Sequence, residues 1–463
     1  MNYNEALEYI HGINRYAKKL GLDNIRRLMR ELGDPQDRLK FIHIAGTNGK
    51  GSTAAITASV MREAGYRTGL YTSPYLQRFT ERIRVDGKEI PEGDVARLAG
   101  KVRTAIEKLT SRGFPHPTEL EVVAAIAFLY FTEEKCDIIA LEVGLGGRFD
   151  PTNIIRAPLA AVIATIDYDH VSRLGDTLEK IASEKAGIIK PGGDVVLYPQ
   201  PDNVRQVFEE TSASVGARLK VCDFASLRQT SYDAHGQRFD YGRFDNLEIS
   251  LLGDYQMYNA ALVVETIDTI NDNKSSGLHI SESALRRGLK NARWPGRLEL
   301  LNENPTVLID AAHNAQCARS LNEALQKYFP DRDCIFIFGV VRDKDYTSII
   351  DAILPTASAV FTVTTGSARA IGACELAEII KKQCAGTWLA ESGRSNAYSS
   401  NSGTVTNRSL QTGVRVHACG STDEAVQRAI VLAKDTGAII CAFGSLYYIG
   451  QLREIFHVSE KNI

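Results

Sequence analysis

The fold of this chain is decided by the stretch FIHIAGTNGKGST, which occupies residues 41–53. Its pattern predicts an apolar strand at 41–45, a glycine-rich turn, and a helix from Ser52 to Ala64. Glycines let backbone N–H groups approach phosphate oxygens, a helix N-terminus adds positive potential, and Lys50 supplies a mobile cation. The stretch therefore predicts a phosphate-binding loop. It departs from the strict G-x-x-x-x-G-K-S/T string, because Ile44 replaces the first glycine and Gly51 follows Lys50. The alternative is an ordinary glycine-rich turn with an exposed lysine.

Short apolar strands recur after this loop and alternate with helical stretches. Further strands are expected at 137–143, 159–166 and 195–197, and residues 4–32 have a helical periodicity that stops at Gly33-Asp34-Pro35. Short strands that are apolar throughout indicate a parallel sheet covered on both faces. We therefore expect residues 1–293 to form an α/β domain of the P-loop ATPase type, with helices at its N-terminal end.

The alternation is interrupted at Trp294-Pro295-Gly296-Arg297 and then restarts. Strands are expected at 307–310, 334–338, 359–363 and 438–443, and helices at 317–328, 348–353, 374–383 and 422–434. Residues 294–463 are thus expected to form a smaller, Rossmann-like α/β domain. Within it, residues 391–412 are rich in Ser, Asn and Gly and predict a mobile surface insertion without a functional role.

The composition is that of an ordinary globular protein. The 463 residues are 44% hydrophobic and 24% charged, and the net charge of -2 gives no indication of a nucleic-acid or membrane partner. The eight cysteines form no C-x-x-C pair, which argues against a disulfide framework or a zinc–thiolate site.

The longest apolar run, Val122–Phe131, is too short to span a bilayer and predicts a buried helix. The chain begins without a secretory h-region, so a cytoplasmic location is expected.

Three residues outside the loop are candidates for its chemistry. Glu142 ends an apolar strand, and strand C-termini open onto the ligand crevice of such sheets. Magnesium keeps several waters, so one carboxylate together with nucleotide phosphates suffices to hold it. His170 closes the following strand and Lys185 lies on a helix. Taken alone, such a histidine is more often a packing residue and such a lysine a solvated cation, so their roles stay open at this point.

Several motifs that lie far apart in the chain bear on these open roles, because together they resemble the motifs of one family. The chain is similar to the folylpolyglutamate synthase/dihydrofolate synthase family, within the superfamily of the Mur ligases, from about residue 20 onward. The motifs, in the family's order, are HIAGTNGKGST (43–53), YTSPYLQRFTERIRVDG (71–87), LEVGLGGRFDPTN (141–153), DYDHVSRLG (167–175), SEKAGIIKPG (183–192), WPGRLE (294–299), DAAHN (310–314), GVVRDKDY (339–346) and FGSLYYIG (443–450).

The resemblance implies ATP and two magnesium ions as cofactors, with a monovalent cation as a further candidate. The ATP phosphates would be held by the loop residues Gly46, Thr47, Asn48, Gly49, Lys50, Gly51 and Ser52, and the nucleotide site would be lined by Asn259, Arg297 and Asp310. Ser73 and Glu142 would hold one magnesium ion, and His170 with a carbamylated Lys185 the second. A lysine carbamate is an anionic oxygen ligand, whereas an ammonium group would be repelled by the metal.

The resemblance also implies the substrate contacts. Arg82, His313 and Ser445 would contact glutamate, with His313 counted among the catalytic groups beside Lys50, His170 and Lys185. The folate or pteroate would lie on Thr118, Glu119, Leu120, Glu121 and Phe149. Family members usually carry Phe where this chain has Leu120, which bears on the pterin-side specificity.

The expected activity is an ATP-dependent amide ligase that adds L-glutamate to folates and to dihydropteroate. The γ-phosphoryl group of ATP would convert a carboxylate into an acyl phosphate, and the glutamate amine would then displace phosphate. A monomer is expected. The rival interpretations are a Mur-type ligase acting on a peptidoglycan precursor, a P-loop switch or motor NTPase, and a non-catalytic nucleotide-binding relative.

Overall fold

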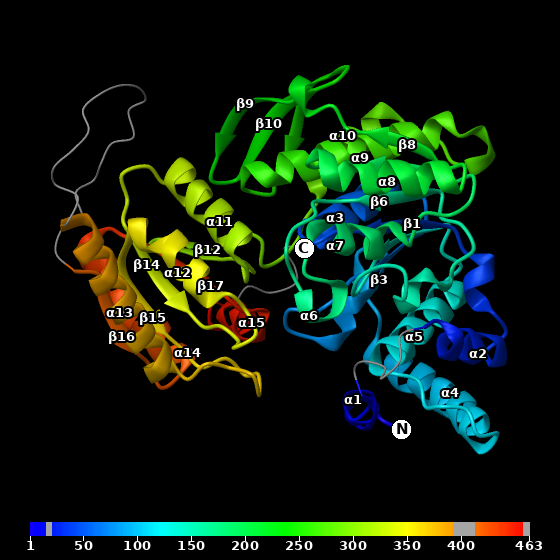
Figure 1. Cartoon of the computed structure of the whole chain (residues 1–463), viewed down its shortest axis with the longest axis horizontal. Helices are drawn as coiled ribbons and strands as arrows, with labels where there is room; N and C mark the ends of the chain where they lie inside the picture. The colour runs from blue at the N-terminus through cyan, green and yellow to red at the C-terminus, as the bar shows by residue number, and fades with distance from the viewer. Residues whose placement is uncertain (15–20, 393–412, 457–463) are drawn as a thin grey trace. The chain divides into compact units, whose positions relative to one another are not determined.

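The structure is a computed structural model, and it describes residues 1–14, 21–392 and 413–456. The chain divides into two compact units, Met1–Trp294 and Pro295–Ile463, each with its own sheet. Both are mixed α/β units, which is the fold class expected from the sequence (Figure 1). The insertion expected at 391–412 lies outside the described residues except for 391 and 392, which end a helix of the second unit.

The first unit is built on an eight-stranded sheet whose central strands are parallel. The strand order is β4-β3-β2-β5-β1-β6-β7-β8, and only the pairs β2–β3 and β3–β4, at one edge, are antiparallel. The bounds are β1 Phe41–Ala45, β2 Thr68–Tyr71, β3 Ile83–Val85, β4 Lys88–Glu89, β5 Ile138–Glu142, β6 Ala160–Ile163, β7 Asp194–Leu197 and β8 Arg218–Val221. The strand β1 lies between β5 and β6, so the sites that follow these three strands share one edge of the sheet.

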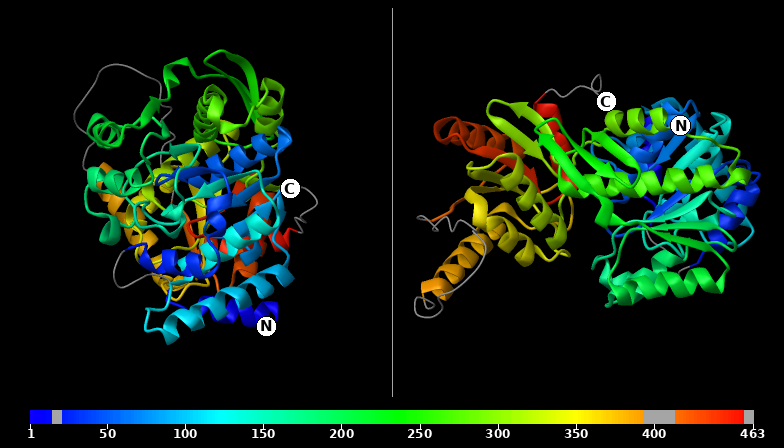
Figure 2. Two further views of the ribbon diagram at one scale, coloured as in Figure 1. Left: turned by 90° about the vertical axis from the view of Figure 1, so that its right-hand side faces the viewer. Right: turned by 90° about the horizontal axis from the view of Figure 1, so that it is seen from above.

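Helices cover both faces of this sheet, as the fully apolar strands predict (Figure 2). In β1, Ile42 and Ile44 face a core shared with α3, α9 and α10, whereas Phe41 faces a core shared with α1, α2, α4 and α5. A third core lies under α7 and α8, against β6 and β7. The helices are α1 Tyr3–His11, α2 Asp23–Glu31, α3 Lys50–Glu63, α4 Glu92–Ser111, α5 Glu119–Glu133, α6 Val171–Leu174, α7 Leu178–Ala186, α8 Asp202–Ser214, α9 Asp254–Asp272 and α10 Glu282–Asn291. The buried helix expected at Val122–Phe131 is confirmed as the body of α5.

A small antiparallel sheet joins the first unit and was not expected from the sequence. It has the order β11-β10-β9, with β9 Arg228–Asp233, β10 Gly236–Tyr241 and β11 Phe244–Ile249. Phe239 and Tyr241 of β10 alternate with less buried residues and pack into the core that contains α9. The strand β9 is exposed along most of its length, so its sequence carries no such alternation.

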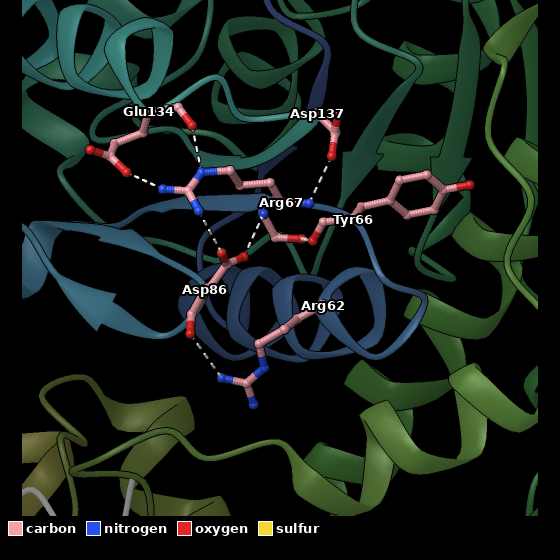
Figure 3. Close-up of polar contacts among 7 residues, drawn as sticks. Arg62, Tyr66, Arg67, Asp86, Glu134 and Asp137 are labelled. Carbon is pink, nitrogen blue, oxygen red and sulfur yellow. Dashed lines mark hydrogen bonds and ion pairs between the residues drawn. The ribbon is translucent and has the colours of Figure 1, made fainter.

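A charge cluster around Arg67 ties the sheet together at the edge opposite to the phosphate loop. Arg67 begins the turn into β2, and its guanidinium bonds to Glu134 at the end of α5 and to Asp86 of the β3–β4 turn (Figure 3). Its backbone N–H donates to Asp137 over 2.8 Å. The amino ends of β2 and β5 are therefore fixed relative to each other, which places their carboxyl ends in register.

The second unit is a six-stranded sheet in the order β12-β13-β17-β14-β15-β16, parallel except for β12. Its strands are β12 Glu299–Glu303, β13 Thr306–Ile309, β14 Cys334–Phe338, β15 Ala357–Thr362, β16 Arg415–Ala418 and β17 Ile439–Phe443. Its helices are α11 Ala315–Tyr328, α12 Tyr346–Ile353, α13 Ala373–Ser392, α14 Thr422–Thr436 and α15 Leu446–Ile455. Strands β13 and β17 are neighbours, so the residues that follow them meet at one edge.

In the described parts of both units, every helix is too short or too polar to cross a lipid bilayer.

Candidate active site

The glycine-rich turn joins β1 to α3, and α3 begins at Lys50, two residues earlier than expected. Gly49 has a left-handed backbone with φ +84, and a Cβ there would lie 2.6 Å from Oδ1 of Asn259. Only glycine therefore satisfies both the conformation and the space at this position. The Thr47 backbone N–H donates to the carbonyl of Thr165 over 2.6 Å, which ties the turn to the segment after β6. The geometry is that of a helix N-terminus with a tight glycine turn, as a phosphate loop requires.

The extra glycine of the loop has a packing reason. A Cβ on Gly51 would lie 3.1 Å from two atoms of the Trp294 indole, which packs directly on the first turn of α3. Trp294 is the last residue of the first unit. The departure from the strict phosphate-loop string is thus explained by an aromatic side chain that needs the space.

Two side chains of α9 hold the loop from behind. Gln256 donates to the Ser52 hydroxyl over 3.2 Å, and Asn259 donates to Gln256 over 3.0 Å. Both residues are buried. Asn259 was expected at this site, but Gln256 was not. Its position three residues before Asn259 on one helix face could have indicated it.

Lys50 and Lys185 reach adjacent carbonyls of the same loop. The Nζ atom of Lys50 donates to Thr47 O over 3.0 Å, and that of Lys185, on α7, donates to Gly46 O over 2.7 Å. Burial lowers the pKa of Lys185 to about 7, and the charge of Lys50 acts in the same direction. Lys185 therefore has a large neutral fraction near pH 7. Its spacing in the sequence left its role open and the family resemblance implied a site residue, and in the structure its side chain bonds to the loop.

Ser73 and Glu142 also lie together. The Ser73 backbone N–H donates to Oε2 of Glu142 over 3.0 Å; Glu142 ends β5, and Ser73 follows the adjacent parallel strand β2. Glu142 is buried. A hydroxyl and a carboxylate beside a phosphate loop are hard oxygen donors that fit Mg²⁺. Among the described residues, no three His, Cys, Asp or Glu side chains gather as a metal-binding group.

His170 lies in the segment after β6, where it precedes α6 with a left-handed φ of +50. Its side chain is 42% exposed, and its Nε2 lies 3.8 Å from Oδ2 of Asp169. The charge of Asp169 raises the pKa of Lys185 and so opposes the effect of burial, which places Asp169 near that lysine. The segment that carries His170 is thus beside the loop.

Of the expected folate contacts, two have their polar atoms engaged in a helix cap. The Glu121 carboxylate accepts from the N–H and the hydroxyl of Thr118, over 2.7 and 2.9 Å, and the Thr118 hydroxyl accepts from Glu121 N–H. This capping box starts α5. Leu120 is only half-buried, and Phe149 is 40% exposed. Leu120 and Phe149 therefore keep apolar side-chain surface accessible.

Arg82 is a buried cation with an aromatic surround. It is 3% exposed, and its guanidinium lies over the rings of Tyr75 and Phe79, 5.1 and 5.7 Å from their centroids. Within the described residues, its Nε and Nη1 atoms have no hydrogen-bond partner. Buried guanidinium groups are ordinarily paired, so this one is suited to an anionic ligand.

The expected residues of the second unit gather at the carboxyl ends of β13 and β17. The Asp310 carboxylate accepts from the N–H groups of Leu298 and Ala312, both over 2.7 Å, and thereby shapes the turn that carries Arg297. The His313 ring nitrogen Nδ1 lies 2.9 Å from Ala311 O. Ser445 is buried and follows β17 after Gly444, whose N–H donates to Ala312 O over 2.9 Å.

A buried polar chain lies behind the glycine turn at 144–147 and was missed by the sequence analysis. Asp150 accepts from Leu145 N–H over 2.8 Å and from the Thr152 hydroxyl over 2.5 Å. The Thr152 oxygen lies 2.8 Å from Nε2 of His43, in the middle of β1. Burial raises the pKa of Asp150, and it lowers the pKa of His43 to about 3. The chain braces the segment after Glu142 against the strand that leads into the phosphate loop.

Comparison with protein families shows that both units match domains of the Mur ligases. The Mur ligase middle domain matches residues 44–267, and the Mur ligase glutamate ligase domain matches residues 296–446. A dihydrofolate synthase/folylpolyglutamate synthase of Bacillus subtilis is 38% identical over 364 residues, which cover 77% of this chain and 84% of that protein. The folylpolyglutamate synthase of Mycobacterium tuberculosis complexed with ADP has a TM-score of 0.85 at 29% identity and covers 98% of both chains. A solved FPGS-AMPPCP-folate complex has a TM-score of 0.79 at 30% identity and covers 98% of this chain and 99% of that one.

The chain belongs to the folylpolyglutamate synthase/dihydrofolate synthase family of ATP-dependent ligases.

Proposed function

We propose that this enzyme adds L-glutamate to folates and to dihydropteroate, through an acyl phosphate made from ATP. The observation that carries the proposal is that Lys50 and Lys185 both bond to one glycine turn, while the Ser73–Glu142 pair lies at the carboxyl ends of β2 and β5, with β5 next to the strand β1 that leads into this turn. The family supports the substrates, because the Bacillus subtilis relative is named for both activities and a similar solved structure holds AMPPCP with folate. The Mur-type alternative on a peptidoglycan precursor is not favoured, because the relatives are folate enzymes.

The phosphoryl-transfer step relies on positioned charge. The three equatorial oxygens of the transferring group carry most of the developing charge, so preorganised donors stabilise the transition state. The loop 46–52 supplies N–H groups from the start of α3, and Lys50 supplies a cation. When bound, magnesium neutralises the same oxygens. Ser73 and Glu142 would hold one ion, and His170 with Lys185 a second.

Lys185 is suited to carbamylation because it is buried, lies at the loop, and has a large neutral fraction near pH 7. The neutral amine nitrogen adds to the carbon of CO₂, an N–C bond forms, and one proton leaves to solvent. The product is an anionic carbamate with hard oxygen atoms. It would remove the cation that now faces Lys50 and provide a ligand that magnesium prefers.

The remaining residues act on the substrates. Arg82 would bind a carboxylate of glutamate, and His313 and Ser445 would complete that contact. Thr118, Glu119, Leu120, Glu121 and Phe149 would support the folate or pteroate, with Leu120 and Phe149 against the ring. Arg297 and Asp310 would bind the nucleotide with Asn259. We further propose that the enzyme is a cytoplasmic monomer.

Product masses test the proposed function directly. Purified enzyme is mixed with MgATP, glutamate and either tetrahydrofolate or dihydropteroate, and we expect each acceptor to gain one glutamate residue with stoichiometric ADP. Lys50→Ala should stay folded and form ADP at least about a hundredfold more slowly, because a positioned donor is lost. Phosphate release that needs no glutamate, or turnover only with a peptidoglycan precursor, would contradict the proposal.

A further inference from the structure

The segment from Thr72 to Arg82, here called the 72–82 loop, connects two expected functional residues. Ser73 lies at its start and Arg82 at its end. The loop is closed at its base, where the Thr72 N–H donates to the Arg82 carbonyl over 3.0 Å. Its last turn is the short 3₁₀ helix Phe79–Arg82. The backbone between these ends is irregular, so its amide groups need acceptors from outside regular secondary structure.

Those acceptors come from one side chain inside the loop. Oε1 of Glu81 accepts from the N–H groups of Gln77 and Arg78, and Oε2 accepts from that of Leu76, each over 2.8 Å. Hydrogen bonds to an ionised acceptor are stronger than neutral ones, and three of them fix consecutive peptide units. Glu81 therefore holds the backbone of residues 76–78 from within the loop.

That shape sets the surroundings of Arg82. The Tyr75 and Phe79 rings, which the guanidinium contacts, lie before and after the three amides held by Glu81. Phe79 is buried in the core under α4 and α5, whereas Tyr75 only borders it. If the amides at 76–78 moved, Tyr75 would move with them, and the guanidinium would lose one wall of its site.

We propose that Glu81 is a positioning residue for the glutamate substrate, because its carboxylate holds the 72–82 loop in the conformation that presents the Arg82 guanidinium. The inference rests on the proposed function, in which Arg82 binds a substrate carboxylate. It assigns Glu81 no contact with either substrate. Both of its carboxylate oxygens accept from backbone donors within the loop.

The test is a change that preserves the shape of Glu81 and removes its charge. In Glu81→Gln, one of the two acceptor oxygens becomes an amide donor, so at least one backbone N–H loses its partner. We expect the KM for glutamate to rise between about 10- and 100-fold, because small misplacements of a binding group carry costs of that size. The KM for MgATP should stay unchanged, since Ser73 is held separately by Glu142. Glu81→Asp, which keeps the charge on a shorter side chain, should lie between wild type and Glu81→Gln.

The matched control is Glu89→Gln. Glu89 contacts the same loop from outside, through the Thr80 hydroxyl at 2.5 Å and the Arg78 side chain at 3.1 Å, but it accepts no backbone N–H of residues 76–78. This variant should leave the KM for glutamate unchanged. Active enzyme is counted by ADP binding in every case, so that partial unfolding lowers the count and not the KM.

A double-mutant cycle separates the two proposals. If Glu81 acts through Arg82, the variant with both Glu81→Gln and Arg82→Met binds glutamate no more weakly than Arg82→Met alone. Additive losses, or an unchanged KM for glutamate in Glu81→Gln beside a raised one in Arg82→Met, would overturn the inference while the proposed function stands. An unchanged KM in Arg82→Met would show that the proposed role of Arg82 is wrong, and the inference would fall with it.

Discussion

Lys185 is a buried amine that bonds to the carbonyl of Gly46, inside a loop designed to attract anions. If the loop binds phosphates and magnesium as proposed, a permanent cation at this position would compete with the metal for the same phosphates. The proposed carbamylation would reverse the sign of the charge of Lys185, which gives a physical reason for a buried lysine at such a site.

We predict that Lys185→Ala lowers the ligase rate at least about a hundredfold, because a charged group at the transferring phosphate is lost. Small carboxylic acids such as acetate should restore part of the rate, since they can supply the missing oxygen ligand. The measurement is ADP formation against acid concentration, with Lys180→Ala, on an exposed turn of the same helix, as the control. A Lys185→Ala enzyme that keeps the wild-type rate without added acid would remove Lys185 from the mechanism.

His43 gives the protein a sensitivity to acid that is separate from catalysis. The Thr152 hydroxyl donates to Asp150, so its oxygen accepts from Nε2–H of His43, which places the proton of the neutral ring on Nε2. Burial, with a smaller effect of Lys190, lowers the pKa of His43 to about 3. Because this pKa is below the unfolded value, the unfolded chain binds more protons as the pH falls. Stability contributed by the neutral ring is present above pH 6.5 and is lost toward pH 3.

The corresponding prediction compares wild type with His43→Gln, whose amide can still donate to Thr152 but does not titrate. Between pH 7 and pH 4.5 the free energy of unfolding should fall more steeply for wild type, by an excess on the order of 1–3 kcal/mol. Urea unfolding at the two pH values measures this difference. Parallel losses in the two proteins would contradict the neutral buried histidine.

At the residue scale, the pattern of residues predicted what is local, whereas contacts made by folding were either implied by the family resemblance or missed. The order of strand, glycine-rich turn and helix around residues 46–52 follows from neighbouring residues, so it could be predicted without the fold. The contact of Lys185 with Gly46 joins residues 139 apart in the chain, and only the family resemblance pointed to it. The chain His43–Thr152–Asp150 belongs to no motif with a known chemistry, because its members act on packing and not on substrate.

At the scale of elements, the position of the phosphate loop depends on how α3 is held. Its partner α10 crosses it at Gly288, where a Cβ would lie 2.3 Å from Cα of Val60. The two helix backbones therefore approach more closely than a side chain at position 288 would permit. This close crossing fixes the position of α3, and with it the position of Lys50 at its start.

We predict that Gly288→Ala lowers the free energy of unfolding by about 1–3 kcal/mol or more, because overpacking must push α3 and α10 apart. The control is Gly100→Ala in α4, where nothing lies within 4 Å of the added Cβ. That change should be neutral or stabilising by about 0.5–1 kcal/mol, since alanine is the better helix former. Thermal unfolding of the two variants measures the contrast, and equal melting temperatures would contradict the close crossing.

Helices and strands could be predicted where their sequences show a clear apolar run or periodicity. The strands β1, β5, β13 and β17 are buried on both faces, so they are apolar throughout and were expected near their observed bounds. The strand β9 is exposed and has no apolar alternation, so the whole small sheet was missed. The helix α13 runs to Ser392 and thus includes the first two residues of the expected insertion.

At the scale of the whole molecule, nucleotide binding should be felt in both units if Arg297 and Asp310 bind ATP as proposed. We predict that MgAMPPCP slows backbone hydrogen exchange in residues 44–53 and also in residues 296–313. Arg297→Met should remove the protection of the second segment and keep that of the first. Hydrogen-exchange mass spectrometry measures both segments in one experiment, and protection confined to 44–53 would exclude the second unit from nucleotide binding.

The presence of two α/β units could be predicted from the sequence. Each unit has its own sheet and core, so alternating strands and helices on either side of residue 294 predicted two α/β folds. The antiparallel strands β3, β4 and β12 were not expected, and neither were the parallel strands β2, β8 and β16. All six are short and contain polar residues or glycine, so they lack the continuous apolar run of β1, β5, β13 and β17.

The indole of Trp294 against Gly51 also has a practical consequence. The chain contains only two tryptophans, and the other, Trp388, belongs to α13. A protein with Trp388→Phe therefore carries one tryptophan, whose indole packs beside Gly51 at the start of α3. If the loop binds ATP as proposed, its emission offers a label-free optical signal for nucleotide arrival, built from an amino acid that the chain already possesses.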